Sequence, residues 1–365
     1  MKVRLTLILV ICTLSIYNSL AVQPADTVKI FTPSAESIYT PAFDELKNML
    51  ENKVPLNFKR AVYLTENAYY DNEINYELYE SYISVLKSFA YSIYKSRRLL
   101  NYKGSDSINC ALNGAIFSLM KDTISYETDN GELKKHIPYD YNFNDIFAKK
   151  HWDNMFVTKL ITTQKGNCHS LPYLYKILAD ELHAKCWLSL APNHMYIRNH
   201  SKDIGWYNTE LTSKQFPTEG WVMASGYITL PSIQNGIFMD TLGTRECVAM
   251  CLIDLANGYN RKSVSKTKNE FILKCCELSL KYYPNNVNAL LLKAETLKDN
   301  YVALQETEAG KAALFEEMQS LYINIYKLGY REMPENMYKD WLASLTREKE
   351  KFVDKKISNK FNSTK

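Results

Sequence analysis

Three residues in the middle of the chain have the types that nucleophilic catalysis needs, namely a thiol, an imidazole and a carboxylate. Cys168 follows a polar turn at 164–167 and precedes apolar residues at helical spacing, so we expect it at a helix N-terminus. The positive end of a helix dipole and a nearby imidazolium both stabilise a thiolate. His194, in a predicted strand, is the candidate imidazole, and Glu210, at the end of the next strand, is the candidate carboxylate that orients it.

Strand geometry predicts that two of these three residues, the histidine and the glutamate, lie next to each other. The imidazole and the carboxylate lie in two short runs rich in aromatic and β-branched residues, separated by a polar turn. If the two runs form a hairpin folded about residue 202, then His194 lies opposite Glu210 and both share one face. Asn208 lies on that face as well and is an alternative orienting group. A slip of one residue in the register would destroy the arrangement.

The elements that must position these residues are predicted to be mostly helical. The chain is 46% hydrophobic with a mean hydropathy of -0.31, so it can bury a full core. Only 12 Gly and 11 Pro occur in 365 residues, which disfavours a loop-rich all-β architecture. We expect helices at 55–100, 107–124, 154–163, 168–182 and from 245 onward, strands at 186–190, 194–198 and 206–211, and a loop at 126–145.

A resemblance to a known family joins these features. The sequence Lys-Gly-Asn-Cys-His-Ser-Leu-Pro at 165–172 is followed by a helix, by His194 on a strand, and by Trp206 with an acid four residues later. This pattern, over about residues 150–260, resembles the transglutaminase-like superfamily of papain-like cysteine enzymes. The resemblance implies a helix, headed by the cysteine, that packs on an antiparallel sheet bearing the histidine and the acid.

The resemblance also implies roles for the residues that match. Cys168 would be the nucleophile, His194 the general base and acid, and Glu210 the orienting carboxylate, where most members carry Asp. The expected activity is that of a cysteine hydrolase or acyl transferase that acts on an amide or peptide bond. No cofactor is expected.

Supporting groups can be proposed from their places in the sequence. The backbone N–H of Cys168 is a natural donor for an oxyanion hole, and Gln164 or Asn167 could supply a second donor. Zinc binding by the pairs Cys168-His169 and His183 with Cys186 is disfavoured, because a helix would separate the two pairs by about 20 Å. We therefore predict no metal site.

The N-terminus has the features of a signal peptide. Lys2 and Arg4 precede an uncharged run at 5–17, and the small residues Ser19 and Ala21 fit a cleavage site after position 21. The run is too short to span a bilayer, so we expect no stable membrane span after cleavage. These features predict an exported protein, either periplasmic or secreted.

The C-terminal part resembles a tetratricopeptide junction. A helix that ends near Pro284 is followed by small and large residues at fixed offsets, among them Ala289 and Ala294. The next candidate terminator, Pro334, comes 50 residues later instead of the usual 34, so a regular array is not supported. These helices could bind a protein partner or simply pack together. Residues 346–365 hold seven Lys or Arg against three Asp or Glu, and we expect a solvated, frayed tail.

Together these features predict a helix-rich α+β chain. Its segments are a signal peptide (1–21), a mainly helical N-terminal part of the core (22–145), the transglutaminase-like core (146–260), tetratricopeptide-like helices (261–345) and a basic tail (346–365). The formal charge of +4 is too small to indicate a nucleic-acid partner. The expected partner is a peptide or protein, as a substrate or as the ligand of a non-catalytic envelope module that keeps the fold. A purely structural scaffold would leave the three-residue arrangement without a role.

Overall fold

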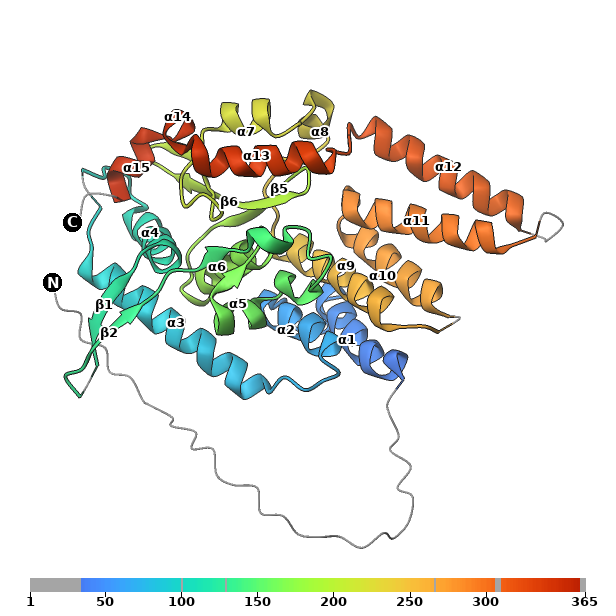
Figure 1. Ribbon diagram of the computed structural model, residues 1–365, viewed down its shortest axis with the longest axis horizontal. Helices are drawn as coiled ribbons and strands as arrows, with labels where there is room; N and C mark the ends of the chain where they lie inside the picture. Colours follow the sequence, from blue (N-terminus) through green and yellow to red (C-terminus); the bar gives the residue numbers. More distant parts are fainter. Residues whose placement is uncertain (1–33, 100, 129, 266, 306–309, 362–365) are drawn as a thin grey trace, which may run out of the picture.

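The computed structural model describes residues 34–99, 101–128, 130–265, 267–305 and 310–361 (Figure 1). Helices make up most of this part of the chain and the sheets are small, which confirms the helix-rich α+β prediction. The predicted signal peptide lies outside the described residues. Over the residues that are described, no helix has both the length and the apolar character needed to cross a bilayer.

The N-terminal part consists of four helices and a hairpin. They are α1 (Ala35–Leu50), α2 (Phe58–Tyr69), α3 (Tyr76–Ser96), α4 (Ser107–Lys121), β1 (Ile124–Glu127) and β2 (Leu133–His136). The single helix expected at 55–100 is wrong, because Asp71 and Asn72 adopt left-handed φ angles of 56° and 65° and break it in two. The loop expected at 126–145 instead includes β2, which pairs antiparallel with β1 through a turn that contains Gly131.

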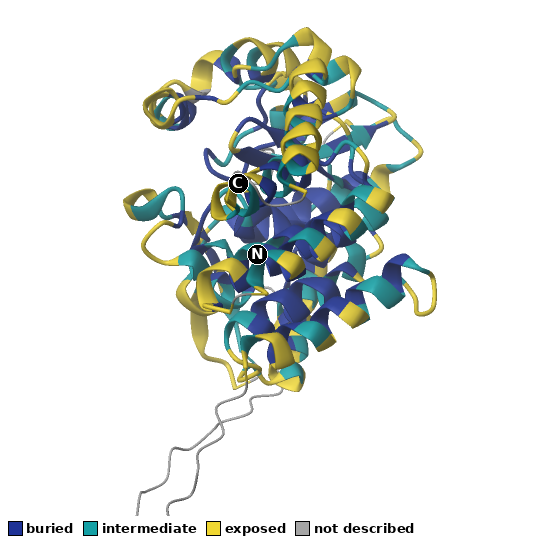
Figure 2. Cartoon of the chain, turned by 90° about the vertical axis from the view of Figure 1, so that its right-hand side faces the viewer, coloured by how far each residue is buried: buried dark blue, intermediate teal, exposed yellow. Residues whose placement is uncertain are grey.

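A central helix and a three-stranded sheet form the middle of the molecule. The elements are β3 (Asp140–Tyr141), η1 (Phe143–Asp145), η2 (Trp152–Met155), α5 (Val157–Thr163), β4 (Lys165–Gly166), α6 (Ser170–Glu181), β5 (Trp187–Ala191), β6 (His194–Ser201) and β7 (Gly205–Thr209). Strands β5, β6 and β7 are antiparallel neighbours in chain order, and α6 packs on β5 and β6. Residues 170–179 of α6 are all buried, and Figure 2 shows the buried residues gathered at the centre of the molecule.

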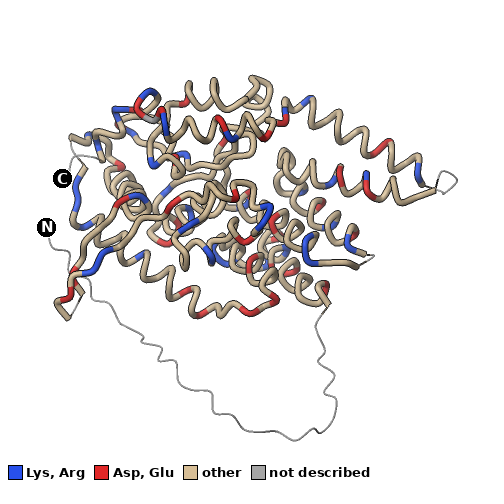
Figure 3. The backbone as a smooth tube through the Cα atoms, viewed as in Figure 1, with Lys and Arg blue, Asp and Glu red and all other residues tan. Residues whose placement is uncertain are grey.

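Successive helices follow the sheet. They are α7 (Glu219–Ser225), α8 (Leu230–Gln234), α9 (Thr244–Lys262), α10 (Lys268–Tyr282), α11 (Val287–Ala303) and α12 (Lys311–Lys327). From α9 to α12 each helix packs on the next, and α9 also packs on α1 and α2, which joins this stack to the rest of the molecule. Basic and acidic residues are mixed along these helices (Figure 3).

The end of the chain turns back onto the core as α13 (Glu335–Arg347), α14 (Lys349–Phe352) and α15 (Lys355–Phe361). The expected frayed tail is therefore corrected for the described residues up to 361. Phe352 and Ile357 are buried, the N–H of Thr218 donates to the carbonyl of Phe352, and Val353 forms a β-bridge with Pro217. Apolar residues spaced among the lysines hold this segment in place. Helix α13, which falls within the segment 261–345 predicted to be tetratricopeptide-like, passes over β5 and β6 in the view of Figure 1.

A buried carboxylate fixes the helix that leads to Cys168. The two oxygens of Glu66, in α2, accept the N–H groups of Val157 (2.7 Å) and Thr158 (2.8 Å) at the start of α5. These are donors that a helix N-terminus leaves without an intrahelical partner. Glu66 therefore fixes the direction in which α5 enters the turn before the cysteine.

Replacing Glu66 by alanine should destabilise the protein. Each buried N–H left without a partner costs about 1–3 kcal/mol, so we expect Glu66→Ala to lower the free energy of unfolding by about 2–4 kcal/mol. Urea denaturation monitored by circular dichroism measures this change. Glu77→Ala, at an exposed position of α3, is the matched control and should change stability by less than about 0.5 kcal/mol. Equal midpoints for the two variants would show that Glu66 does not hold α5.

Candidate active site

Cys168 lies at the start of the central helix, as its sequence setting predicts. The side-chain oxygen of Asn167 accepts the N–H groups of His169 (2.9 Å) and Ser170 (3.3 Å) and so caps α6. The hydroxyl of Ser170 donates to the carbonyl of Asn154 and ties the helix start to the preceding segment. The thiol is thus held at the positive end of the α6 dipole.

His194 and Glu210 are in direct contact. The imidazole Nε2 lies 2.7 Å from Oε2 of Glu210, and Oε1 of the same carboxylate accepts the N–H of Thr212 at 2.8 Å. Both side chains are buried, with 5% of His194 and 3% of Glu210 exposed. His194 follows a two-residue turn, Pro192 and Asn193, in which Asn193 has a φ of 57°. Proline followed by a left-handed residue fits a type II turn, and this turn fixes where β6 begins.

The strand register differs from the expected one by two residues. Arg198 pairs with Asn208 and Ser201 with Gly205, so the hairpin folds about residue 203 and not 202. Because the side-chain period of a strand is two, a shift of two residues keeps the same face inward. Glu210 lies just beyond β7 and still reaches His194.

Three of the other predicted site residues are placed elsewhere. The amide of Asn208 donates to the carbonyl of Pro217 at 3.1 Å, and the amide of Gln164 donates to the carbonyl of Ile137 at 3.2 Å. Trp206 is 44% exposed and pairs with His200, six residues along β6 from His194, or about 20 Å. Asn208 and Gln164 are thus engaged by backbone carbonyls, and the ring of Trp206 contacts the rings of Trp187 and His200.

The fourth of these, Asn167, is close to the thiol but already engaged. Its oxygen caps α6, and its amide nitrogen lies 2.8 Å from the sulfur of Met155. It is therefore a positioning residue for the helix start instead of an oxyanion donor. The backbone N–H of Cys168, at the head of α6, stays the predicted oxyanion donor.

The structure adds a residue that the sequence did not reveal. The hydroxyl of Tyr338, on α13, lies 3.5 Å from the Cys168 sulfur and 3.2 Å from Nδ1 of His194. Trp341, one turn further along α13, places its ring 4.9 Å from the imidazole in an edge-on arrangement. The apolar residues at helical spacing in α13 could have indicated a buried face, but nothing local indicates that this face covers the site.

The charges of the site favour a thiolate and an imidazolium. Burial disfavours the ionised thiol, but the hydrogen bond and the charge of His194 outweigh burial and lower the pKa of Cys168. Burial likewise disfavours the imidazolium, but the Glu210 carboxylate and Cys168 outweigh it and raise the pKa of His194 to about 10. Burial raises the pKa of Tyr338 far above its usual value, so its hydroxyl keeps its proton. That hydroxyl can accept from Nδ1–H while it donates to the sulfur.

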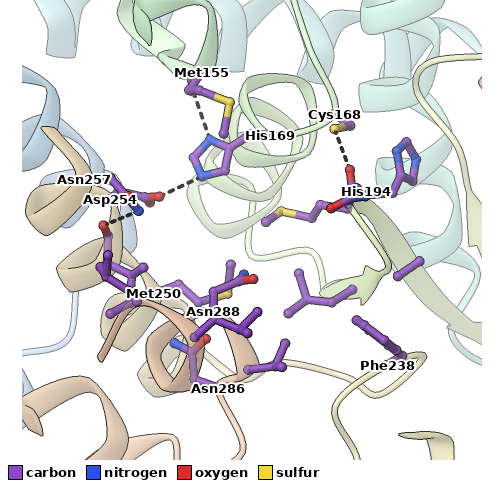
Figure 4. A pocket seen from close by; sticks show the side chains of 18 of the residues that line it. Met155, Cys168, His169, His194, Phe238, Met250, Asp254, Asn257, Asn286 and Asn288 are labelled. Atoms are coloured by element: carbon purple, nitrogen blue, oxygen red, sulfur yellow. Dashed lines mark hydrogen bonds and ion pairs between the residues drawn. The ribbon is translucent and has the colours of Figure 1, made fainter. Parts of the chain in front are cut away.

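Cys168 and His194 are among the residues that line a cavity of about 420 Å³. Cys168 and His194 form part of one wall, and side chains of α9 and α11 form the opposite wall (Figure 4). The Cys168 sulfur also lies 3.7 Å from the carbonyl oxygen of Asn193, in the turn before β6. The lining is largely apolar, and its apolar residues include Leu190, Met195, Phe238, Met250 and Leu291. Its polar residues include Asp254, Asn257 and Asn288. A cavity of this kind is typical of a small-molecule or peptide site.

The remaining cysteines of the described chain have a different setting. Cys110, Cys186, Cys247, Cys251, Cys275 and Cys276 are free thiols and buried, whereas Cys168 is partly exposed. Burial raises the pKa of Cys186 to about 12, for example, so this thiol is not a nucleophile at neutral pH. Within the described ranges, no three His, Cys, Asp or Glu side chains are grouped so that they could hold a metal ion.

Replacing Tyr338 by phenylalanine tests the role of its hydroxyl. A hydrogen bond to a charged group contributes about 1.5–3 kcal/mol, so losing it should raise the Cys168 pKa and slow alkylation at pH 7 about 10-fold. The rate of modification by iodoacetamide, with the site identified by mass spectrometry, measures the effect. Tyr326→Phe, at an exposed position of α12, should leave the rate unchanged. Equal rates for the two variants would mean that Tyr338 only fills space.

Comparison of the chain with family models, with curated proteins and with solved structures finds no match. The likeness to the transglutaminase-like superfamily therefore rests on the cysteine, the histidine and the acid, their order in the chain and the elements that carry them.

Proposed function

We propose that this chain is an exported cysteine hydrolase or acyl transferase with a transglutaminase-like core, acting on an amide or peptide bond. One observation carries the proposal. The two nitrogens of the buried His194 ring face different partners, Glu210 on one side and the Cys168–Tyr338 pair on the other. This is the relation between nucleophile, base and orienting acid that activates a cysteine.

The chemistry would proceed in two steps through a thioester. The Cys168 thiolate attacks the carbonyl carbon, and the oxyanion that forms faces the backbone N–H at the head of α6. As the C–N bond breaks, the His194 imidazolium gives its Nδ1 proton to the leaving amine. A water molecule, or a second amine, then attacks the thioester while His194 takes its proton. The C–S bond breaks and the thiolate returns, with an acid or a new amide as the product.

The other two residues of the site would act by holding this pair. Glu210 fixes the imidazole ring with Nδ1 toward the sulfur and stabilises the positive charge. The Tyr338 hydroxyl aligns the two reacting groups before attack. Its contribution ties the C-terminal helix α13 to the activity.

The cavity supports a peptide or protein substrate. Its largely apolar walls suit uncharged side chains of a substrate. Apart from the histidines, the charged residues among the described residues that line it are acidic, namely Asp254 and Glu295. We propose that α11, in the tetratricopeptide-like part, holds the substrate against the core. Hydrolysis is favoured over cross-linking, because the sequence indicates no second pocket for an amine acceptor.

The alternative is a non-catalytic module that binds a peptide or protein in this cavity. The position of Tyr338 is the observation that favours it, since its hydroxyl contacts both the Cys168 sulfur and Nδ1 of His194 and so occupies a hydrogen bond of each reacting group. On this alternative the thiol is no more reactive than free cysteine, and a ligand binds equally well without it.

The experiment that separates the two uses a peptide mixture. The protein is incubated with the mixture, and cleavage products are identified by mass spectrometry for the wild type, for Cys168→Ala and for Cys247→Ala, a buried cysteine outside the cavity. We expect cleavage, or a thioester on Cys168, that disappears in Cys168→Ala and persists in Cys247→Ala. Peptides that bind equally to wild type and Cys168→Ala without being cleaved would contradict catalysis and support the binding module.

A further inference from the structure

A second, largely buried imidazole belongs to the residue that follows the nucleophile in the chain. The Nδ1 atom of His169 is 2.9 Å from the carbonyl oxygen of Met155, and its Nε2 atom is 3.1 Å from Oδ1 of Asp254, on α9 (Figure 4). The exposed fractions are 12% for the His169 side chain and 19% for that of Asp254. Both residues line the cavity that Cys168 also lines.

Both partners of this ring accept hydrogen bonds. A backbone carbonyl can only accept, so Nδ1 of His169 must carry a proton. The second oxygen of Asp254 accepts from the hydroxyl of Tyr173 at 2.9 Å, and burial keeps the pKa of that hydroxyl far above its usual value. The other oxygen, Oδ1, faces Nε2 of His169. A proton on Nε2 as well as on Nδ1 would give each of these acceptors a donor.

We infer that His169 is a fixed imidazolium, positioned by Asp254, that stabilises the Cys168 thiolate independently of His194. The inference rests on the proposed function, in that it takes Cys168 as the nucleophile. The two histidines do different work. The Nδ1 atom of His194 faces the Tyr338 hydroxyl and interacts with the reacting sulfur, so its proton can move, whereas the two nitrogens of His169 face Met155 and Asp254. His169 therefore supplies charge and not proton transfer.

The charges around His169 agree with this assignment. Burial alone would disfavour the imidazolium, but the Asp254 carboxylate, the Met155 carbonyl and Cys168 raise the pKa of His169. The groups that face it are Asp254 from α9, Tyr173 from α6, Cys168 beside it in the chain, and Glu66 from α2. Each of these is neutral or negative, so each tolerates or favours a positive ring.

The pairing of His169 with Asp254 limits how far His169 can change the Cys168 pKa. Asp254 offsets part of the ring's charge, so the charge of His169 should stabilise the thiolate less than that of His194 does. We expect a change of about 0.5–1 in the Cys168 pKa, which alters the thiolate fraction at a fixed pH about 3-fold to 10-fold. His194, with a direct path to the sulfur, should have the larger effect.

The test measures the rate of Cys168 alkylation by iodoacetamide against pH in His169→Gln, both alone and combined with His194→Ala. We expect His169→Gln to raise the apparent pKa by about 0.5–1 in both backgrounds, because the two imidazoliums act independently. His200→Gln, on the far end of β6, is the matched control and should leave the profile unchanged. Identical profiles for His169→Gln and the control would overturn the inference.

Two further measurements keep the inference open to disproof if His169→Gln does not fold. Asp254→Asn removes the charge that holds the imidazolium and should shift the profile in the same direction. In the wild type, ¹⁵N NMR of the His169 ring should show both nitrogens protonated at pH 7–8. A neutral ring at that pH would overturn the inference on its own.

These outcomes separate the inference from the proposed function. The alkylation profiles need no substrate, so a shift in His169→Gln supports the inference even if no peptide is cleaved. Cleavage that depends on Cys168, with a profile insensitive to His169 and Asp254, would leave the proposed function standing and reject the role of His169.

Discussion

Replacing His194 by alanine should lower kcat/KM for any amide that the protein cleaves by about 10³-fold or more. The variant loses the charge that stabilises the Cys168 thiolate, and it loses the acid that protonates the leaving amine. Without the imidazolium, burial raises the pKa of the thiol against the weaker opposition of the Tyr338 hydrogen bond and the His169 charge. Alkylation of Cys168 at pH 7 should therefore also fall, by about 100-fold.

The control for this variant lies on the same strand. His200→Ala removes an imidazole from the other end of β6, where the ring contacts Trp206, and should leave both rates within about twofold of wild type. A His194→Ala variant that alkylates as fast as the control would mean that the buried pair is structural and that the thiol is not activated.

Deleting residues 349–365 should cause the largest loss of stability. Phe352 is buried and stacks on Trp221 with ring centroids 3.9 Å apart, and Ile357 is fully buried. Burying two side chains of this size contributes about 3–6 kcal/mol, so we expect the free energy of unfolding to fall by that amount. The midpoint of urea denaturation measures it.

Two point variants at adjacent positions test whether the loss of stability comes from the buried side chains. Ile357→Ala should lower the free energy of unfolding by about 2–4 kcal/mol, whereas Lys356→Ala, next to it and exposed, should change it by less than about 0.5 kcal/mol. An unchanged midpoint for the deletion would support the frayed tail that composition alone indicates.

The contact between His194 and Glu210 could be predicted from the sequence because it depends on local rules. Helical spacing after Cys168 places the thiol at a helix start, and strand periodicity puts the histidine and the acid on one face. The expected register was wrong by two residues, and the contact persists because only the parity of the shift decides which face a side chain occupies.

The parts that the sequence did not predict depend on contacts between distant segments. Tyr338 reaches His194 across 144 residues of chain, and no pattern around position 338 indicates what its helix covers. The composition after position 346 is basic, and composition alone does not indicate that the few apolar residues there, Phe352 and Ile357, are buried against the core. The break between α2 and α3 depends on left-handed Asp71 and Asn72, which helical periodicity alone does not reveal.

The dependence of Cys168 alkylation on pH in the wild-type protein tests the central claim most directly. Because the Cys168 pKa is lowered and that of His194 is about 10, the thiolate should form at a lower pH than in a free cysteine, and the ion pair should persist until the imidazolium loses its proton near pH 10. The pH dependence of modification by iodoacetamide should therefore give an apparent pKa below the value of about 8.5 for free cysteine. An apparent pKa at or above 8.5 would contradict an activated thiol at this site.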